Sequence, residues 1–190
     1  MFSSFKPRAE MKDIFARGTD LKASGRFYET LAFNNFGEND QQNLVTVYDR
    51  IQDITPTMNE IFIKYLVEIS PNGHNPITEN QIDRYLKQFF LGERNDEYVE
   101  TTIKFFNLLR ESRFEPGKVI VIFNQFSFYL TTHILHNFAL KPNAAFEYMK
   151  SVSAAVNIDQ ELLIEVMTER MLENVLAELA SLTGANAKIT

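Results

Sequence analysis

Signals that start α-helices recur along this chain, and they constrain its fold more than any other feature. A cap residue or a proline stands at the head of each segment in which apolar residues follow at three- and four-residue spacing. The predicted starts are Asn39 with Gln42, Thr55 with Pro56, Thr78 with Gln81, Asn95, Pro116 and Pro142. No segment alternates polar and apolar residues strongly enough to indicate a strand. We therefore predict an all-α chain.

The predicted organisation has three parts: an N-terminal extension over 1–37, a helical domain over 38–184 and a short tail over 185–190. The extension should hold one or two short helices broken by Gly18 and Gly25. The helix that opens at Pro116 is apolar nearly all round in its first half, as expected of a central packed helix. The last helix should run to about Leu182, with an irregularity at 157–159 and a stop at Gly184.

Composition excludes several classes of function. The net charge of −6 disfavours a nucleic-acid partner and an anionic membrane surface. The absence of cysteine removes disulfides, Fe–S clusters and cysteine-type zinc sites, and it fits a cytoplasmic protein. The first fifteen residues, MFSSFKPRAEMKDIF, lack the apolar core of a signal peptide, and no run approaches the ~18 apolar residues of a membrane span.

Residues that could carry catalysis or hold a metal are few. No Gly-rich nucleotide loop, P-loop or nucleophile elbow occurs, so we expect a binding protein and no enzyme. His133 and His136 share a helical face, but acidic partners are missing nearby, so we expect no metal site. His74 lies in the predicted loop SPNGHNP, where a surface histidine is the simplest interpretation.

Phenylalanine is the compositional outlier, with 17 Phe and no Trp. Eight of these residues fall on four successive predicted helices: Phe62, Phe89, Phe90, Phe105, Phe106, Phe123, Phe126 and Phe128. Their inward faces either line one ligand pocket between the helices or form a solid aromatic core. The spacing leaves both possibilities open.

Four segments carry a likeness to a known family. They are NFGENDQQNLVTVYDRIQDI, QIDRYLKQFFLGERNDEYVE, RFEPGKVIVIFNQF and EYMKSVSAAVNIDQELLIEVMTERMLENV. In order and spacing, over roughly residues 33–175, they resemble the globin-sensor domain of heme-based aerotaxis transducers and other globin-coupled sensors. The resemblance implies a globin-like fold with long G-type and H-type helices, a role in signal transduction, and a homodimer formed by the last two helices.

The likeness breaks at the heme ligand. The family's proximal histidine corresponds to about Leu109, and its distal tyrosine falls near Leu66, beside Tyr65. Leucine has no lone pair to offer iron, so we expect no cofactor. Non-heme relatives of such sensors imply an apolar ligand instead, such as a fatty acid. The expected pocket is lined by Phe62, Tyr65, Leu66, Phe89, Phe105, Phe106, Leu109 and Phe126. Arg110, Arg113 or Lys118 either meets a carboxylate head group or is simply exposed to solvent.

A narrow apolar stripe near the end of the chain favours dimerisation. Leu172, Leu176 and Leu179 recur at three- and four-residue spacing, as in the seam of a coiled coil. We expect them, with His133 and His136, at a dimer interface. The alternative is that the stripe packs on its own domain.

Three hypotheses follow for function. The first is a non-heme globin-fold sensor or regulator that binds a small apolar ligand or a signalling partner. The second is a heme-binding gas sensor with an unusual axial ligand such as Tyr65, His74 or His133. The third is an interaction module with a filled core. A chain without an output domain would act through a partner or form part of a longer protein.

Overall fold

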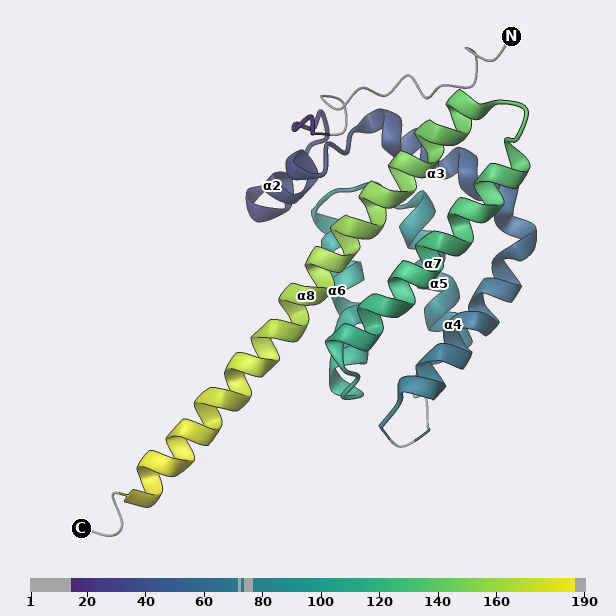
Figure 1. The fold of residues 1–190 in the computed structure, drawn as a ribbon. Helices are drawn as coiled ribbons and strands as arrows, with labels where there is room; N and C mark the ends of the chain where they lie inside the picture. Colours follow the sequence, from purple (N-terminus) through teal and green to yellow (C-terminus); the bar gives the residue numbers. More distant parts are fainter. Residues whose placement is uncertain (1–14, 72, 74–76, 187–190) are drawn as a thin grey trace.

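The structure is a computed structural model that describes residues 15–71, 73 and 77–186; from Glu169 onward it describes only one side chain, that of Leu176. Every regular element in this part of the chain is a helix, so the all-α prediction is confirmed. The elements are α2 (Gly25–Phe33), α3 (Glu38–Ile51), the 3-10 turn η2 (Gln52–Ile54), α4 (Thr55–Ile69), α5 (Glu79–Leu91), α6 (Asp96–Glu111), α7 (Pro116–Asn137) and α8 (Pro142–Asn186) (Figure 1).

Several helices start where local chemistry predicts. Thr78 forms a capping box, because its hydroxyl accepts from the Gln81 amide while its own amide donates to the Gln81 side chain. Asn95 caps α6 by accepting the Tyr98 amide at 3.0 Å. Prolines open α7 and α8, as predicted.

Two predicted caps are wrong. Asn39 lies inside α3, which starts after Gly37, and the side chain of Asp40 accepts the Gly37 amide at 3.0 Å. Thr55 has helical backbone angles and makes no side-chain cap, because η2 leads directly into α4. In both places the preceding backbone, which the cap pattern does not describe, decides where the helix begins.

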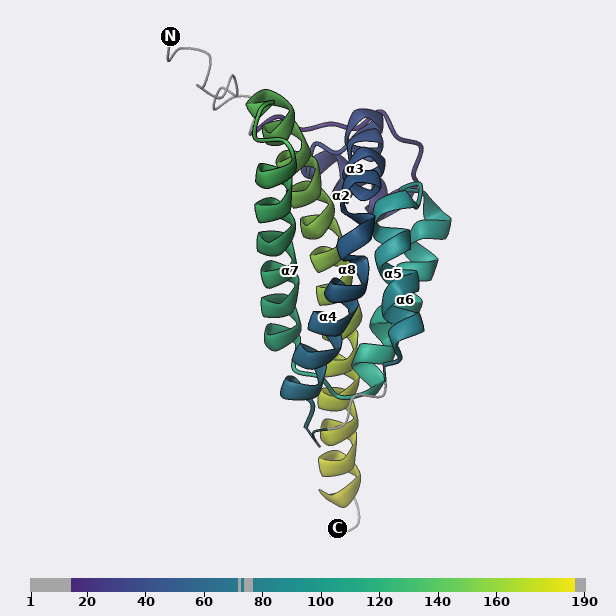
Figure 2. The ribbon, with the colours of Figure 1, turned by 90° about the vertical axis from the view of Figure 1, so that its right-hand side faces the viewer.

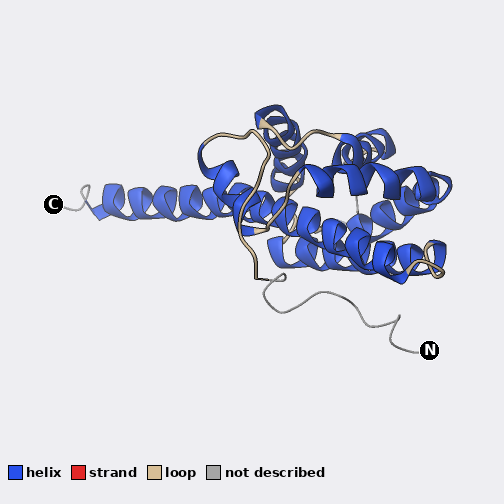
Figure 3. Ribbon diagram, turned by 90° about the horizontal axis from the view of Figure 1, so that it is seen from above, coloured by secondary structure: helices blue, strands red, loops and turns tan. Residues whose placement is uncertain are grey.

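The 45-residue helix α8 is the axis of the fold. It packs beside α7 and crosses α3 and α6, while α4 and α5 complete the body (Figures 1 and 2). Its distal half continues away from the body (Figure 3). The predicted irregularity at 157–159 and the predicted stop at Gly184 are wrong, because α8 is continuous through both.

Apolar burial and polar contacts together hold the helices to α8. Phe27 and Leu31 of α2 are buried in the same core as the rest of the body, although they fall in the predicted extension. On the surface of α8, Glu161 accepts hydrogen bonds from Thr30 at 2.9 Å and from Asn34 at 3.0 Å. One end of α2 is therefore fastened to the middle of α8.

Candidate functional site

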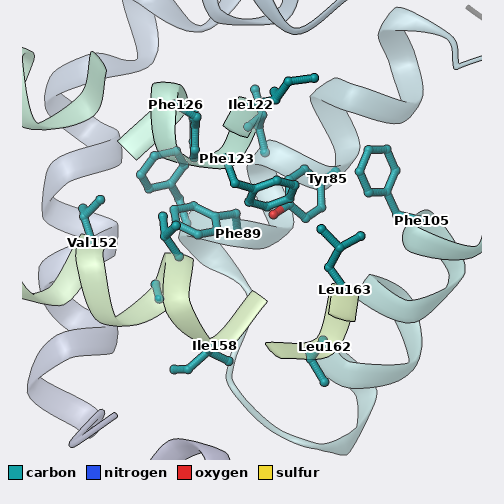
Figure 4. Packing of buried hydrophobic residues seen from close by; sticks show 14 of the residues in the cluster. Tyr85, Phe89, Phe105, Ile122, Phe123, Phe126, Val152, Ile158, Leu162 and Leu163 are labelled. Atoms are coloured by element: carbon teal, nitrogen blue, oxygen red, sulfur yellow. The ribbon is translucent and has the colours of Figure 1, made fainter. Parts of the chain in front are cut away.

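Aromatic rings fill the region where α5, α6 and α7 meet. Tyr85 and Phe105 are stacked, with ring centres 4.5 Å apart and planes 8° from parallel. The ring centres of Phe106 and Phe123 lie 5.9 and 6.0 Å from that of Tyr85. Figure 4 shows Phe123 beside Tyr85. These tilted and edge-on arrangements are favourable aromatic contacts, so the side chains form a packed core here.

Most of the residues predicted to line a ligand pocket belong to the packed core. No more than 7% of the surface is exposed for any of Phe62, Leu66, Phe89, Phe105, Phe106, Leu109 and Phe126. Tyr65 is half-buried. Phe105 borders a separate groove of about 420 Å³ between α5 and α6, whereas the structure brings Phe62, Tyr65 and Phe126 together at one groove.

That groove, the α4–α7 groove, has a volume of about 290 Å³. Phe62 and Phe126 form its floor, with ring centres 5.4 Å apart in an edge-on contact. Its lining consists of Met58, Ile61, Phe62, Tyr65, Ile122, Gln125, Phe126, Phe128, Tyr129, Thr132 and His133. The volume lies just below the ~300–1,000 Å³ typical of small-molecule sites.

Hydrogen-bonding groups accompany the apolar floor of the α4–α7 groove. Tyr65 projects from α4, and Tyr129, Thr132 and His133 project from α7. The rings of Tyr129 and His133 lie 4.5 Å apart. A largely apolar groove with a few polar groups can take an elongated apolar molecule and orient its polar end.

Heme does not fit the position that the family likeness implies for it. Leu109 is 2% exposed and offers iron no donor atom. Beside it on α6, Phe105 and Phe106 pack against Tyr85, so a macrocycle would have to displace a packed aromatic cluster. Tyr65 and His133, two of the proposed substitute ligands, line the α4–α7 groove instead.

A second polar feature, which the sequence interpretation missed, lies inside the core. The Asp159 carboxylate is completely buried on α8 and accepts the Tyr85 hydroxyl at 2.6 Å and the Tyr98 hydroxyl at 2.7 Å. Arg94, only 1% exposed, stacks its guanidinium 4.3 Å from the centre of the Tyr98 ring and donates to main-chain carbonyls at the end of α5. We call these four residues the Asp159 cluster.

Burial dominates the electrostatics of the Asp159 cluster. It raises the pKa of Asp159 above its ordinary value, and the charge of Arg94 and the two tyrosine hydrogen bonds oppose this shift only in part. Burial, reinforced by the negative charge of Asp159, raises the pKa values of Tyr85 and Tyr98 well above the usual range. The sequence does contain a signal for this cluster, because Asp159 in the segment NIDQELL is an acid on an otherwise apolar helical face.

The residues predicted at a dimer interface are scattered. His133 lines the α4–α7 groove, whereas His136 and Leu176 are exposed. The side chains of Leu172 and Leu179 lie outside the described part of the chain, and so does His74.

The three candidate cations for a carboxylate head group sit around the turn between α6 and α7. None of them lines the α4–α7 groove. Lys118 is exposed and pairs with Glu115 at 3.2 Å, and Arg113 is exposed at the end of α6. Arg110 is half-buried. A ligand in the groove would therefore meet Tyr65, Tyr129 or His133 and none of these cations.

Apolar side chains line the outer face of α7. Val121, Phe128 and Leu135 are 56%, 71% and 50% exposed, and they recur at seven-residue spacing, so they lie along one face. We call this row the α7 stripe. On α8, Ile164 is 47% exposed. Phe128 also borders the α4–α7 groove, so the stripe and the groove adjoin each other.

Among the described residues, no group of three or more His, Cys, Asp or Glu could hold a metal ion, and no helix has the length and apolarity to cross a bilayer. No family model matches the chain, and no curated protein matches it either.

Proposed function

We propose that this chain is a non-heme, globin-like sensor or regulatory protein that binds a small apolar ligand, such as a fatty acid, and catalyses no reaction. The α4–α7 groove is the ligand site in this proposal, and it is the observation that carries the proposal. Its floor is aromatic, and its polar groups are few. The absence of an iron ligand at Leu109 and the packing around Tyr85 support a non-heme protein.

The order of the helices supports the globin-like part of the proposal. Two long helices end the described chain and lie side by side, after a series of shorter helices that pack against them (Figure 2). This is the arrangement expected of G-type and H-type helices. The likeness of sequence extends over the same elements.

In this proposal the protein forms a homodimer through α7 and α8, and the dimer transmits the signal. The α7 stripe exposes Phe128 to solvent, and a second copy would cover it. The predicted interface residues His136 and Leu176 are exposed on the same two helices, and Leu172 and Leu179 remain predicted members. A cytoplasmic signalling partner would then respond to the dimer.

A modest apolar contact is enough for useful affinity. Each buried methylene contributes about 0.8 kcal/mol, so six of them contribute roughly 5 kcal/mol before the cost of binding. The groove requires no cation if Tyr129 or His133 hydrogen-bonds to the carboxylate.

Titration calorimetry with decanoate tests the ligand site. Ile61→Trp places a large ring in the groove and should weaken decanoate binding at least about tenfold, because the ring occupies the volume of the ligand. Ile103→Trp makes the same change on α6, outside the groove, and should bind like the unmodified protein. Equal loss in both variants, or no binding to the unmodified protein, contradicts the proposal.

A filled-core interaction module is the second candidate, and the stacked Tyr85 and Phe105 rings favour it. Such a protein would bind no decanoate and would still dimerise. Hemin titration separates the remaining alternative: the non-heme proposal predicts only the broad absorption of unligated hemin. A sharp, saturable Soret band at one heme per chain would instead support axial ligation, with Tyr65 and His133 as the first residues to mutate.

A further inference from the structure

The Asp159 cluster joins three parts of the fold at one point. Asp159 comes from the middle of α8, Tyr85 from α5 and Tyr98 from α6, and Arg94 lies in the turn between those two helices. Each carboxylate oxygen receives one tyrosine hydroxyl, Oδ2 from Tyr85 and Oδ1 from Tyr98. α8 is thereby tied to both helices through a single residue.

Stability alone does not account for this cluster. A buried carboxylate loses its hydration, and the charge of Arg94 offsets this cost only in part. Apolar side chains of similar volume usually serve a core as well or better. Buried polar groups of this kind are best attested as devices that select one register among several similar packings.

The geometry defines the position of α8 more sharply than the surrounding apolar contacts do. Two short hydrogen bonds, at 2.6 and 2.7 Å, reach Asp159 from separate helices. A slide of α8 by one turn, about 5.4 Å, or a rotation about its axis would break both. Leu162 and Leu163 beside it could repack after such a movement, because apolar contacts have no fixed direction.

We propose that the two tyrosine hydrogen bonds to Asp159 form a register lock for α8, and that opening the lock moves the distal half of α8 relative to the body. The lock is independent of the ligand proposal. Only the interpretation of this movement as the output of a sensor rests on the proposed function. The distal half follows because α8 is one continuous helix.

The chain is suited to a direct distance measurement because it contains no cysteine. Spin labels on Lys104→Cys and Thr168→Cys would report the position of distal α8 against α6, since both positions are exposed. Each labelled protein is mixed with excess unlabelled chain, so that pulsed electron resonance records distances within one chain.

The test compares the lock with another polar contact of α8. Asp159→Asn and the double variant Tyr85→Phe with Tyr98→Phe should broaden the distance distribution or shift it by about one helical turn, about 5 Å. Ser151→Ala removes a buried hydrogen bond to Asp40 of α3 and should leave the distribution unchanged. The proposal is overturned if folded lock variants keep the native distribution, or if Ser151→Ala changes it equally.

The pH dependence of the distance distribution is a second test, because a merely structural role for Asp159 predicts no such dependence. The charged or titratable groups that face Asp159 are Tyr85 from α5, Tyr98 from α6 and Arg94. The other packed helices meet α8 at different residues: α2 at Glu161, α3 at Ser151 and α7 at Gln160. A protonated Asp159 can no longer accept both hydroxyls unchanged, since one oxygen now carries a hydrogen.

Acidification of the unmodified protein should therefore reproduce the distance distribution of Asp159→Asn, while that variant shows no such response to pH. A pH response that persists in Asp159→Asn contradicts the assignment to this carboxylate. Decanoate binding, measured on the same variants, separates the two proposals. If the lock variants keep the native distance distribution while decanoate still binds, only the lock proposal is refuted. If the distribution changes in these variants but the unmodified protein binds no decanoate, only the ligand site is refuted.

Discussion

The α4–α7 pair and the α5–α6 pair use aromatic residues in opposite ways. Between α5 and α6, Tyr85 and Phe105 stack in parallel with ring centres 4.5 Å apart, and the groove of about 420 Å³ that they border is lined mainly by polar residues of the two helices. Between α4 and α7, Phe62 and Phe126 meet edge-on and leave a groove of about 290 Å³ above them. A Phe-rich composition therefore says little about a ligand site until the opposing side chains are known.

The largest expected effect is a loss of stability when a buried ring of the aromatic core is removed. Phe106 is completely buried, so Phe106→Ala should lower the free energy of unfolding by about 3–5 kcal/mol through lost burial and a new cavity. Tyr65→Ala, at the half-buried groove, should cost roughly 1 kcal/mol. Urea unfolding measures both. Similar losses for the two variants would show that the groove is packed as tightly as the core.

The outer face of α7 gives the next largest effect. Phe128→Glu places a charge in the α7 stripe and should raise the dissociation constant of the homodimer at least about tenfold, or about 1.4 kcal/mol. Leu140→Glu is the matched control, because Leu140 is 98% exposed in the turn before α8. Sedimentation across a concentration series reports the constant. A monomeric unmodified protein, or equal effects of the two changes, argues against this interface.

Asp159 should make stability depend on pH in a defined direction. Its folded-state pKa lies above the ordinary value of 3.8, so the folded protein binds this proton more tightly than the unfolded chain does. The stabilisation from this group is complete below pH 3.8 and is lost as pH rises through the raised pKa.

Unfolding free energies of the unmodified protein and Asp159→Asn, measured over a pH series, isolate that contribution. The stability of the unmodified protein relative to the variant should fall with rising pH in this window and then level off. A relative stability that rises with pH would mean that Arg94 and the tyrosines outweigh the effect of burial.

The smallest effect should come from the surface of α8. Arg26 and Glu165 pair at 2.6 Å, but the Arg26 side chain is 74% exposed, so solvent screens the attraction. Arg26→Ala should change the unfolding free energy by less than about 0.5 kcal/mol. A loss above about 1 kcal/mol in thermal unfolding would show that α2 is held to α8 mainly by this pair.

Much of the secondary structure could be predicted because capping is local chemistry. Thr78 and Asn95 bind amides three residues ahead, so nearby sequence is sufficient. The cap predicted at Thr55 is wrong because the helical turn before it, η2, already supplies the start of α4. The predicted irregularity near Asn157 to Asp159 does not occur, because two distant tyrosines satisfy Asp159 and the helix continues.

The candidate sites were less predictable because they depend on what faces each helix. Helical spacing correctly places Phe62 and Phe106 on inward faces, but it cannot say which of them borders open space. The Asp159 cluster joins residues 61 and 74 positions apart in the chain. No local pattern links an acid on one helix to hydroxyls on two others.

The most direct test of the central claim is to locate bound decanoate by nuclear Overhauser contacts in methyl-labelled protein. The proposal predicts contacts from the decanoate chain to the methyl groups of Ile61 and Ile122, on the two walls of the α4–α7 groove. It predicts none to Ile103 or Leu109 on α6. Contacts to Leu109, with none to Ile61 or Ile122, would contradict it, because they would place the ligand in the region that the aromatic rings fill.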